Sequence, residues 1–214
     1  MNWIEICLEA LLAISQISLA VVAFIGINSW RHEYKEKRQI EIAEETLELF
    51  YKVVDVLQSI RNPTVYLDEI KDIERKKEEN EKQYKARQKA QVLFDRYDEQ
   101  IEVFNKIHSL RYRFMAKIGK NKAKPFADLR RIVHKITTSA IILKDLWGLE
   151  RKPEDKTHWK FVRENENIFW DDRDSNNPTN LEIERIVSEI ETTCEKIISG
   201  KNNTHSRFGS KATT

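Results

Sequence analysis

The chain has 214 residues, of which 40% are hydrophobic and 34% are charged, and its 37 Lys and Arg residues against 35 Asp and Glu residues give a formal net charge of +2. This length is about one typical domain, and the near-neutral charge indicates no particular class of partner. Only 5 Gly and 4 Pro residues are present, which argues against a turn-rich all-β fold and a glycine-rich phosphate-binding loop and favours an all-α protein.

Residues 10–30 form the most apolar segment of the chain and contain no charged side chain. At about 1.5 Å per residue, a helix over this segment is long enough to cross a hydrocarbon core of about 30 Å. Trp3 and Trp30 bracket it, as expected for indole rings at the headgroup level. A cleaved secretion signal is the alternative, but the leader carries Glu5 and Glu9 in place of a basic region. We therefore expect a single N-terminal transmembrane helix.

The charges that flank this segment predict its orientation. No Lys or Arg precedes it, whereas four cations follow directly, namely Arg31, Lys35, Lys37 and Arg38. Cytoplasmic flanks carry the excess of cations. We therefore expect residues 1–9 to be a short non-cytoplasmic N-terminus and residues 31–199 to lie in the cytoplasm.

One face of the predicted transmembrane helix carries small residues around a central amide. Ala13, Gln16, Ala20 and Ala23 recur at helical spacing. Small residues let helix backbones approach closely, and an amide forms hydrogen bonds across such a pair. We expect a homo-oligomer through this face, and the alternative is a lone span whose small residues fall there by chance.

Beyond the membrane segment, the same helix is predicted to continue as an amphipathic helix. It should end near Asn62, because Pro63 disfavours helical geometry in the residue before it. Its apolar stripe, at steps of three and four, consists of Ile40, Ala43, Leu47, Phe50, Val54 and Leu57. The mostly charged residues 68–89 follow, and we expect a solvated helical overhang there, with a flexible linker as the alternative.

Three further amphipathic helices are expected over residues 90–118, 125–148 and 180–200, each of which ends at or next to a glycine. The connection over residues 149–179 is too long for a simple turn, and its Trp and Phe residues predict that it folds back onto the helices. The polar tail over residues 200–214 is expected to be disordered. Because the apolar face of each helix must be covered by another apolar face in water, we expect an antiparallel bundle of about four helices.

The strongest local charge lies over residues 106–135, which we call the basic hairpin. Ten cations face one carboxylate there, and they are Lys106, Arg111, Arg113, Lys117, Lys120, Lys122, Lys124, Arg130, Arg131 and Lys135. Since the first helix leaves the membrane and the second returns, the turn of this hairpin should lie near anionic lipid headgroups, which attract each cation by about 1 kcal/mol. Nucleic acid is an alternative ligand, because Tyr112 and Phe114 alternate with the cations. A solvated turn without a ligand is the other alternative.

We find no motif for catalysis, a metal or a cofactor. Cys7 and Cys194 lack the paired spacing of a zinc or disulfide framework. The Glu-x-x-His pair of di-iron bundles is missing, and so are a phosphate loop, a nucleophile elbow and a kinase signature. A calcium loop that opens at Asp172 fails, because Asn177 and Ile183 occupy the positions of its glycine and its closing acid. We expect no enzymatic activity and no cofactor.

Two stretches, LELFYKVVDVLQSIRNP (47–63) and KIHSLRYRFMAKIGKNKAKPFADLRRIV (106–133), together with the overall plan, resemble uncharacterised bacterial single-pass membrane proteins with a helical cytosolic part. The resemblance implies the bacterial inner membrane and carries no motif of known activity. We therefore expect a membrane-anchored, non-enzymatic interaction or scaffold module that holds a protein partner, which the sequence does not identify. The alternatives are a membrane-tethered nucleic-acid-binding protein and a small oligomerising membrane-active effector.

Overall fold

The computed structural model describes residues 3–149, 155–171 and 176–208, and it describes no side chains for residues 4–10, 13 and 201–208. The described residues form seven α-helices and one 3-10 helix and contain no strand, so the prediction of an all-α protein is confirmed. The elements are α1 (Trp3–Ile60), α2 (Leu67–Ile70), α3 (Glu81–Glu99), α4 (Ile101–Lys117), η1 (Lys120–Ala123), α5 (Lys124–Gly148), α6 (Lys156–Phe169) and α7 (Pro178–Phe208).

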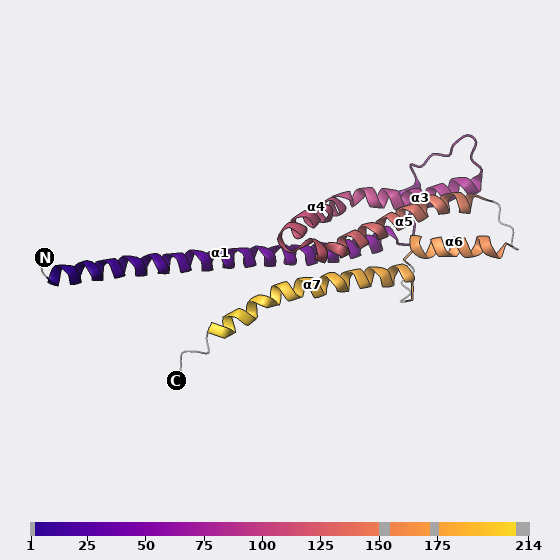
Figure 1. Cartoon of the computed structure of the whole chain (residues 1–214). Helices are drawn as coiled ribbons and strands as arrows, with labels where there is room; N and C mark the ends of the chain where they lie inside the picture. The colour runs from indigo at the N-terminus through magenta and orange to yellow at the C-terminus, as the bar shows by residue number, and fades with distance from the viewer. Residues whose placement is uncertain (1–2, 150–154, 172–175, 209–214) are drawn as a thin grey trace.

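Helix α1 is one continuous helix of 58 residues, which corresponds to a length of about 87 Å. Its N-terminal part projects alone from the rest of the molecule, and its C-terminal part enters the bundle (Figure 1). It ends at Ile60, two residues before Asn62 and close to the predicted end at Asn62 and Pro63. The buried face of α1 consists of Ile42, Ala43, Thr46, Phe50, Val53, Val56, Leu57 and Ile60.

The phase of this buried face differs from the predicted stripe. Ala43, Phe50 and Leu57 are fully buried, whereas Leu47 and Val54 are only partly buried. The difference arises because α1 is packed between two partners, α4 and α7. A helix between two neighbours buries a wider arc than the narrow stripe of a two-helix contact.

Four helical rods make the bundle, as expected. Helices α3 and α4 follow one another in one rod, and α1, α5 and α7 are the other three (Figure 1). Helix α1 is antiparallel to α4 and α7, and α5 is antiparallel to α3 and α7. One hydrophobic core runs through them, and in it the ring of Phe126 contacts the rings of Phe50 and Phe114.

The prediction of one helix over residues 90–118 is wrong, because the helix is interrupted at Gln100. This residue has φ −103° and ψ 9°, and its N–H donates to the carbonyls of Tyr97 and Asp98 in place of a regular helical bond. Apolar periodicity continues across the interruption, and for this reason the sequence pattern does not reveal it. Helix α3 ends here, and α4 begins with Ile101.

The charged residues 68–89 do not form the predicted helical overhang. Only α2 and the first turns of α3 are helical, and residues 71–80 form turns and loop. Two arginines of α3 hold this segment against the bundle: Arg96 Nε donates to Glu69 Oε1 at 2.6 Å, and Arg87 Nε donates to Glu79 Oε1 at 2.8 Å. These partly buried ion pairs join the segment to α3.

The predicted turn and helix start around residue 119 are confirmed. Gly119 adopts φ 134°, a conformation that L side chains rarely adopt. Pro125 lies in the first turn of α5, where its missing N–H costs nothing. The fourth predicted helix begins at Pro178, close to the expected start, but its predicted end at Gly200 is wrong because α7 continues to Phe208.

The connection over residues 149–179 contains helix α6 and folds back onto the bundle, as predicted for its described part. Phe169 of α6 is buried, and its ring lies 5.3 Å from the ring of Trp147 and 4.2 Å from the ring of Trp170, between centroids. Residues 150–154 and 172–175, which include the start of the rejected calcium loop, lie outside the described part of the chain.

A buried arginine joins α1 to α6 and α7. Arg61 is 1% exposed and lies directly after α1. Its guanidinium donates to the side chain of Asn180 at 2.6 Å and to three backbone carbonyls at 2.9–3.1 Å, which belong to Asn167, Ile168 and Trp170. The backbone carbonyl of Arg61 also accepts from the N–H of Asp171 at 2.8 Å. Arg61 therefore links the end of α1 to the last turn of α6 and to the first turn of α7.

Within the residues that the structure describes, no helix is both long and apolar enough to cross a membrane. The structure therefore does not support the transmembrane helix predicted over residues 10–30. This range includes Ala10 and Ala13, whose side chains lie outside the description.

Candidate functional site

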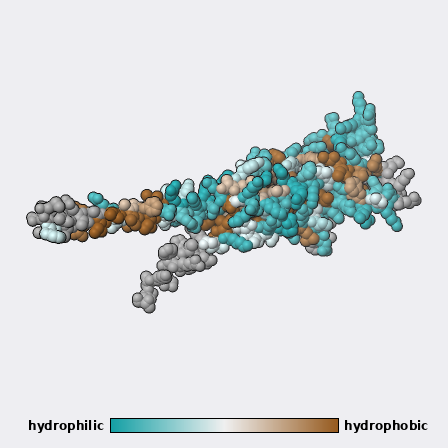
Figure 2. Space-filling view, in the orientation of Figure 1, coloured by the Kyte–Doolittle hydropathy of each residue, from teal (hydrophilic) through white to brown (hydrophobic). Residues whose placement is uncertain are grey.

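The first candidate surface is the N-terminal arm, which we define as residues 11–30 of α1. In Figure 2 this arm is a mostly hydrophobic rod that stands clear of the bundle. Its large apolar side chains are 51–73% exposed, and they are Leu11, Leu12, Ile14, Ile17, Leu19, Val21, Val22, Phe24, Ile25, Ile27 and Trp30. They occupy all sides of the helix, whereas a helix in water normally presents apolar residues on one side only. Such a surface needs an apolar environment or an apolar partner.

Two hydroxyl groups of the arm are satisfied within the helix. Ser15 Oγ donates to the carbonyl of Leu12, and Ser18 Oγ donates to the carbonyl of Ile14, both at 2.8 Å. Internal bonds of this kind lower the cost of placing a serine in an apolar medium.

The predicted oligomer face lies on the same arm. Gln16, Ala20 and Ala23 are exposed, and the side chain of Ala13 lies outside the description. Small exposed residues around an amide fit a close approach of two helices. The structure contains one copy of the chain, so the homo-oligomer stays a prediction.

The second candidate surface is the basic hairpin, whose ten cations the structure divides into two groups. Four of them form ion pairs with nearby carboxylates, and these are Arg113 with Glu45, Lys124 and Arg131 with Asp128, and Lys135 with Glu182. In the described part of the chain, no carboxylate oxygen lies within 4.0 Å of the other six, which are Lys106, Arg111, Lys117, Lys120, Lys122 and Arg130. The hairpin therefore presents a smaller positive surface than the sequence predicts.

Asp128 is the centre of the paired group. Its side chain is 5% exposed and accepts from Lys124 Nζ at 2.6 Å and from Arg131 at 2.9 Å, and Arg185 of α7 lies at 3.6 Å. Burial by itself would raise the pKa of Asp128, but the hydrogen bond from Lys124 and the surrounding cations outweigh burial and lower the pKa. The cations around Asp128 thus hold α5 to α7 and contribute to the fold.

The turn of the basic hairpin lies at the end of the bundle from which the arm projects (Figure 1). Gln39 of α1 marks this position, because its Nε2 donates to the backbone carbonyl of Lys117 at 2.7 Å. Gln39 follows Trp30 by nine residues, which is about 14 Å along a helix. Lys120 and Lys122 are exposed in the turn. The unpaired cations of the turn and the apolar arm therefore lie on the same side of the protein.

One of the two aromatic residues that suggested base stacking is inaccessible. Phe114 is fully buried, and its ring contacts that of Phe126 at 5.1 Å between centroids. Tyr112 remains exposed beside His108. Phe114 is therefore not available to stack on a base, and of the two aromatic residues that suggested the nucleic-acid alternative only Tyr112 is exposed.

The described residues hold no group of three or more His, Cys, Asp or Glu side chains that could bind a metal ion. Cys194 is buried, and burial raises its pKa to about 12. This thiol therefore stays protonated near neutral pH, and only the thiolate form of cysteine is a good nucleophile.

No family model, no curated protein and no solved structure matches this chain. The candidate sites are therefore argued from the structure of this chain alone.

The structure also contains a groove at the basic hairpin, which the apolar periodicity of the sequence does not predict. One feature of the sequence could have indicated this groove: Arg111 is a cation that lies at helical spacing between the apolar residues Ile107 and Phe114.

Proposed function

We propose that this protein is a membrane-anchored, non-enzymatic helical module. In this proposal, the N-terminal arm inserts into the bacterial inner membrane as a single-pass helix, and the bundle holds a protein partner at the cytosolic face. The observation that carries the proposal is the exposure of apolar side chains on all sides of the arm.

The free energy of transferring these exposed side chains from water to hydrocarbon is large. Complete burial of a large aliphatic or aromatic side chain stabilises by about 1.5–3 kcal/mol. Ten such side chains in the arm, Trp30 aside, are half to three-quarters exposed, so their transfer to hydrocarbon contributes about 10–20 kcal/mol. The amides of Gln16 and Asn28 oppose insertion by about 2–7 kcal/mol each. The apolar contribution outweighs this cost over most of the range, and more clearly if the amide of Gln16 pairs with that of a second copy.

The position of the basic turn supports an orientation with the bundle at an anionic leaflet. Trp30 ends the arm and suits the headgroup level. The headgroup layer extends about 5–8 Å beyond the hydrocarbon, so the turn beside Gln39 lies within about one Debye length of its surface. Lys117, Lys120 and Lys122 then contribute up to about 1 kcal/mol each through attraction to anionic lipids.

Membrane fractionation tests the anchor. We expect the full chain to stay with the membrane after an alkaline carbonate wash, and the double variant Val21→Asp, Ile25→Asp to move to the soluble fraction with its helical content retained. The matched control Val21→Leu, Ile25→Leu should stay with the membrane. Recovery of the wild-type chain in the soluble fraction, as a monomer or as an oligomer held by its arms, would contradict the anchor.

The orientation of the basic turn is tested by a fluorophore attached at Asn121→Cys in a background without the two native cysteines. In vesicles that contain anionic lipid, we expect quenching by spin labels on the lipid headgroups, and less quenching in the variant Lys120→Glu, Lys122→Glu. The control Lys106→Glu should keep the quenching. Absence of quenching in the wild type would contradict the lipid-facing turn, and equal quenching in all variants would show that Lys120 and Lys122 do not hold the turn at the lipid. Binding of single-stranded nucleic acid with a steep dependence on salt would favour the nucleic-acid alternative.

Cross-linking in membranes tests the oligomer. We expect a dimer or higher oligomer of the full chain that is weakened by Gln16→Leu and unchanged by Asn28→Leu. If the wild-type chain shows no cross-linked species, the homo-oligomer is wrong. If expression of the wild type arrests growth and Gln16→Leu relieves the arrest, the membrane-active effector replaces the scaffold.

A further inference from the structure

A groove of about 190 Å³ lies on the side of the basic hairpin, between the end of α3, α4 and α5. Its floor is apolar and consists of Phe104, Ile107, Phe126, Leu129 and Val133. The first four are among the buried core residues. The floor is therefore rigid, since it belongs to the core that holds the two helices together.

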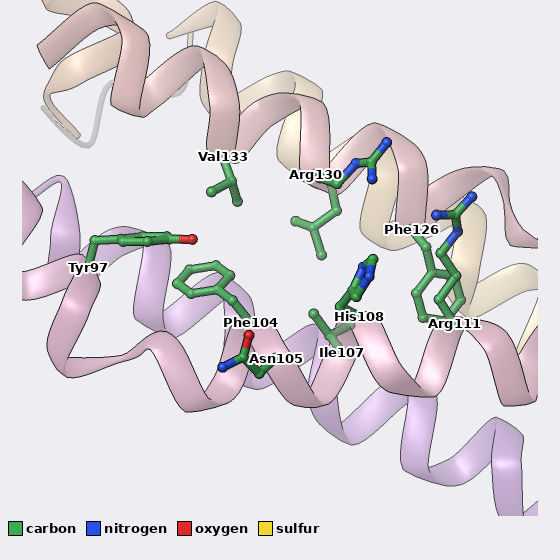
Figure 3. A pocket seen from close by; sticks show the side chains of 10 residues that line it. Tyr97, Phe104, Asn105, Ile107, His108, Arg111, Phe126, Arg130 and Val133 are labelled. Carbon is green, nitrogen blue, oxygen red and sulfur yellow. The ribbon is translucent and has the colours of Figure 1, made fainter. Parts of the chain in front are cut away.

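The rim of this groove is polar and carries only cationic or neutral groups. Arg111 and Arg130 lie at the end near Phe126, with His108 beside them, and the Tyr97 hydroxyl points into the groove from the other end (Figure 3). Burial, followed by the charge of Asp98, raises the pKa of Tyr97, so its hydroxyl is a donor at neutral pH. No carboxylate is among the residues that line the groove.

Arg111 has an unmet hydrogen-bonding requirement. Its Nε is shielded from solvent, and this atom has no hydrogen-bond partner among the described residues. A buried donor without a partner costs about 1–3 kcal/mol. Neither Arg111 nor Arg130 has a carboxylate of the described chain within ion-pair distance, although four other cations of the same hairpin are paired. An acceptor from outside the chain that reaches Arg111 would supply the missing partner, and Arg130 would give the same acceptor a second cation.

We propose that this groove binds a small organic anion with an apolar body. Its carboxylate or phosphate accepts hydrogen bonds from Arg111 and Arg130, whose planar guanidinium groups match two oxygens of such an anion. Its apolar part lies on the floor beside Phe104 and Val133. A cavity of about 150 Å³ holds a benzene molecule, so the groove has room for one aromatic ring or a short acyl chain. A free metabolite and a membrane lipid both offer this chemistry, and the site does not depend on the membrane anchor.

Three soluble probes separate the two parts of this recognition: phenyl phosphate has both the ring and the anion, inorganic phosphate has only the anion, and benzyl alcohol has only the ring. We expect saturable binding of phenyl phosphate to the full chain in neutral detergent, with methyl resonance shifts at Ile107, Leu129 and Val133. The other two probes should bind at least tenfold more weakly. Equal affinity of phenyl phosphate and inorganic phosphate, or the absence of saturable binding, overturns the proposal.

Variants localise the anion. Arg130 is exposed, so Arg130→Leu should leave the fold intact and weaken phenyl phosphate binding about tenfold, as expected for the loss of a charged hydrogen bond. The matched control Lys106→Leu removes an exposed cation of α4 that does not line the groove, and it should not change the affinity. Equal weakening by both variants would show only non-specific attraction and would overturn the site.

A competition experiment identifies the source of the anion. Nanodiscs with anionic lipid should displace phenyl phosphate if the ligand is part of a lipid. Displacement only by free octanoate or benzoate supports a soluble metabolite, and failure of every such anion to displace phenyl phosphate overturns the proposed ligand class.

Discussion

Replacement of Arg61 by methionine should destabilise the bundle strongly. Methionine has a similar length but no donor, so four described acceptors of the guanidinium lose their partner: the Asn180 side chain and the carbonyls of Asn167, Ile168 and Trp170. A hydrogen bond to a charged group contributes about 1.5–3 kcal/mol. Four such bonds do not add fully, because water enters the site and the cost of burying the charge disappears. We expect the free energy of unfolding to fall by about 3–5 kcal/mol.

Two further variants check this magnitude. Arg61→Lys keeps the charge but loses the planar fork, so it should lie between the wild type and Arg61→Met. Arg38→Met removes an exposed arginine of α1, whose described carboxylate partner is Glu41 at 2.9 Å, and it should cost less than about 1 kcal/mol.

Denaturant unfolding of the full chain in mild detergent, followed by tryptophan fluorescence, measures these values. Trp147 and Trp170 lie close to the network and report its loss. Amide hydrogen exchange should also accelerate in the last turn of α6 in Arg61→Met, because two of the carbonyls belong to that turn. A stability of Arg61→Met within about 1 kcal/mol of the wild type would refute the reasoning, since the hydrogen bonds would then only offset the cost of burying the charge.

Three further predictions concern single residues. Gly119→Ala should destabilise the chain by about 1–3 kcal/mol, because the φ of Gly119 is 134°. Gly26→Ala should not destabilise it, because Gly26 is helical and has open space around it. Equal unfolding midpoints of the two variants would contradict this prediction. The hydrogen bond from Arg87 lowers the pKa of Glu79 from its ordinary value of about 4.5 to about 2. At pH values above 4.5 the ionised carboxylate therefore stabilises the loop, and this stabilisation is lost as the pH falls from about 4.5 to about 2. A carboxyl resonance of Glu79 that titrates near 4.5 would refute this. In a Cys7→Ser background, iodoacetamide at pH 8 should modify Cys194 only after unfolding, because burial raises its pKa to about 12; rapid modification of the folded chain would show that Cys194 is accessible.

Local features of the fold could be predicted from the sequence because they depend on neighbouring residues. The end of α1 before Pro63, the turn at Gly119 and the start of α5 at Pro125 each follow from the backbone preferences of one residue. Apolar periodicity likewise predicts the helices and their bundle, since each stripe must be covered. The interruption at Gln100 cannot be predicted in this way, because the apolar spacing continues through it.

Only the tertiary structure decided which cations are free of ion pairs and can therefore bind a ligand. The sequence shows ten cations in the basic hairpin, but their partners Glu45 and Glu182 come from α1 and α7, far away along the chain. In the same way, no local pattern shows that Arg61 is buried or that Arg111 borders a groove. Periodicity reports which side of a helix is apolar, whereas the pairing of a charge depends on which helices become neighbours, and that is determined by the packing of the whole core.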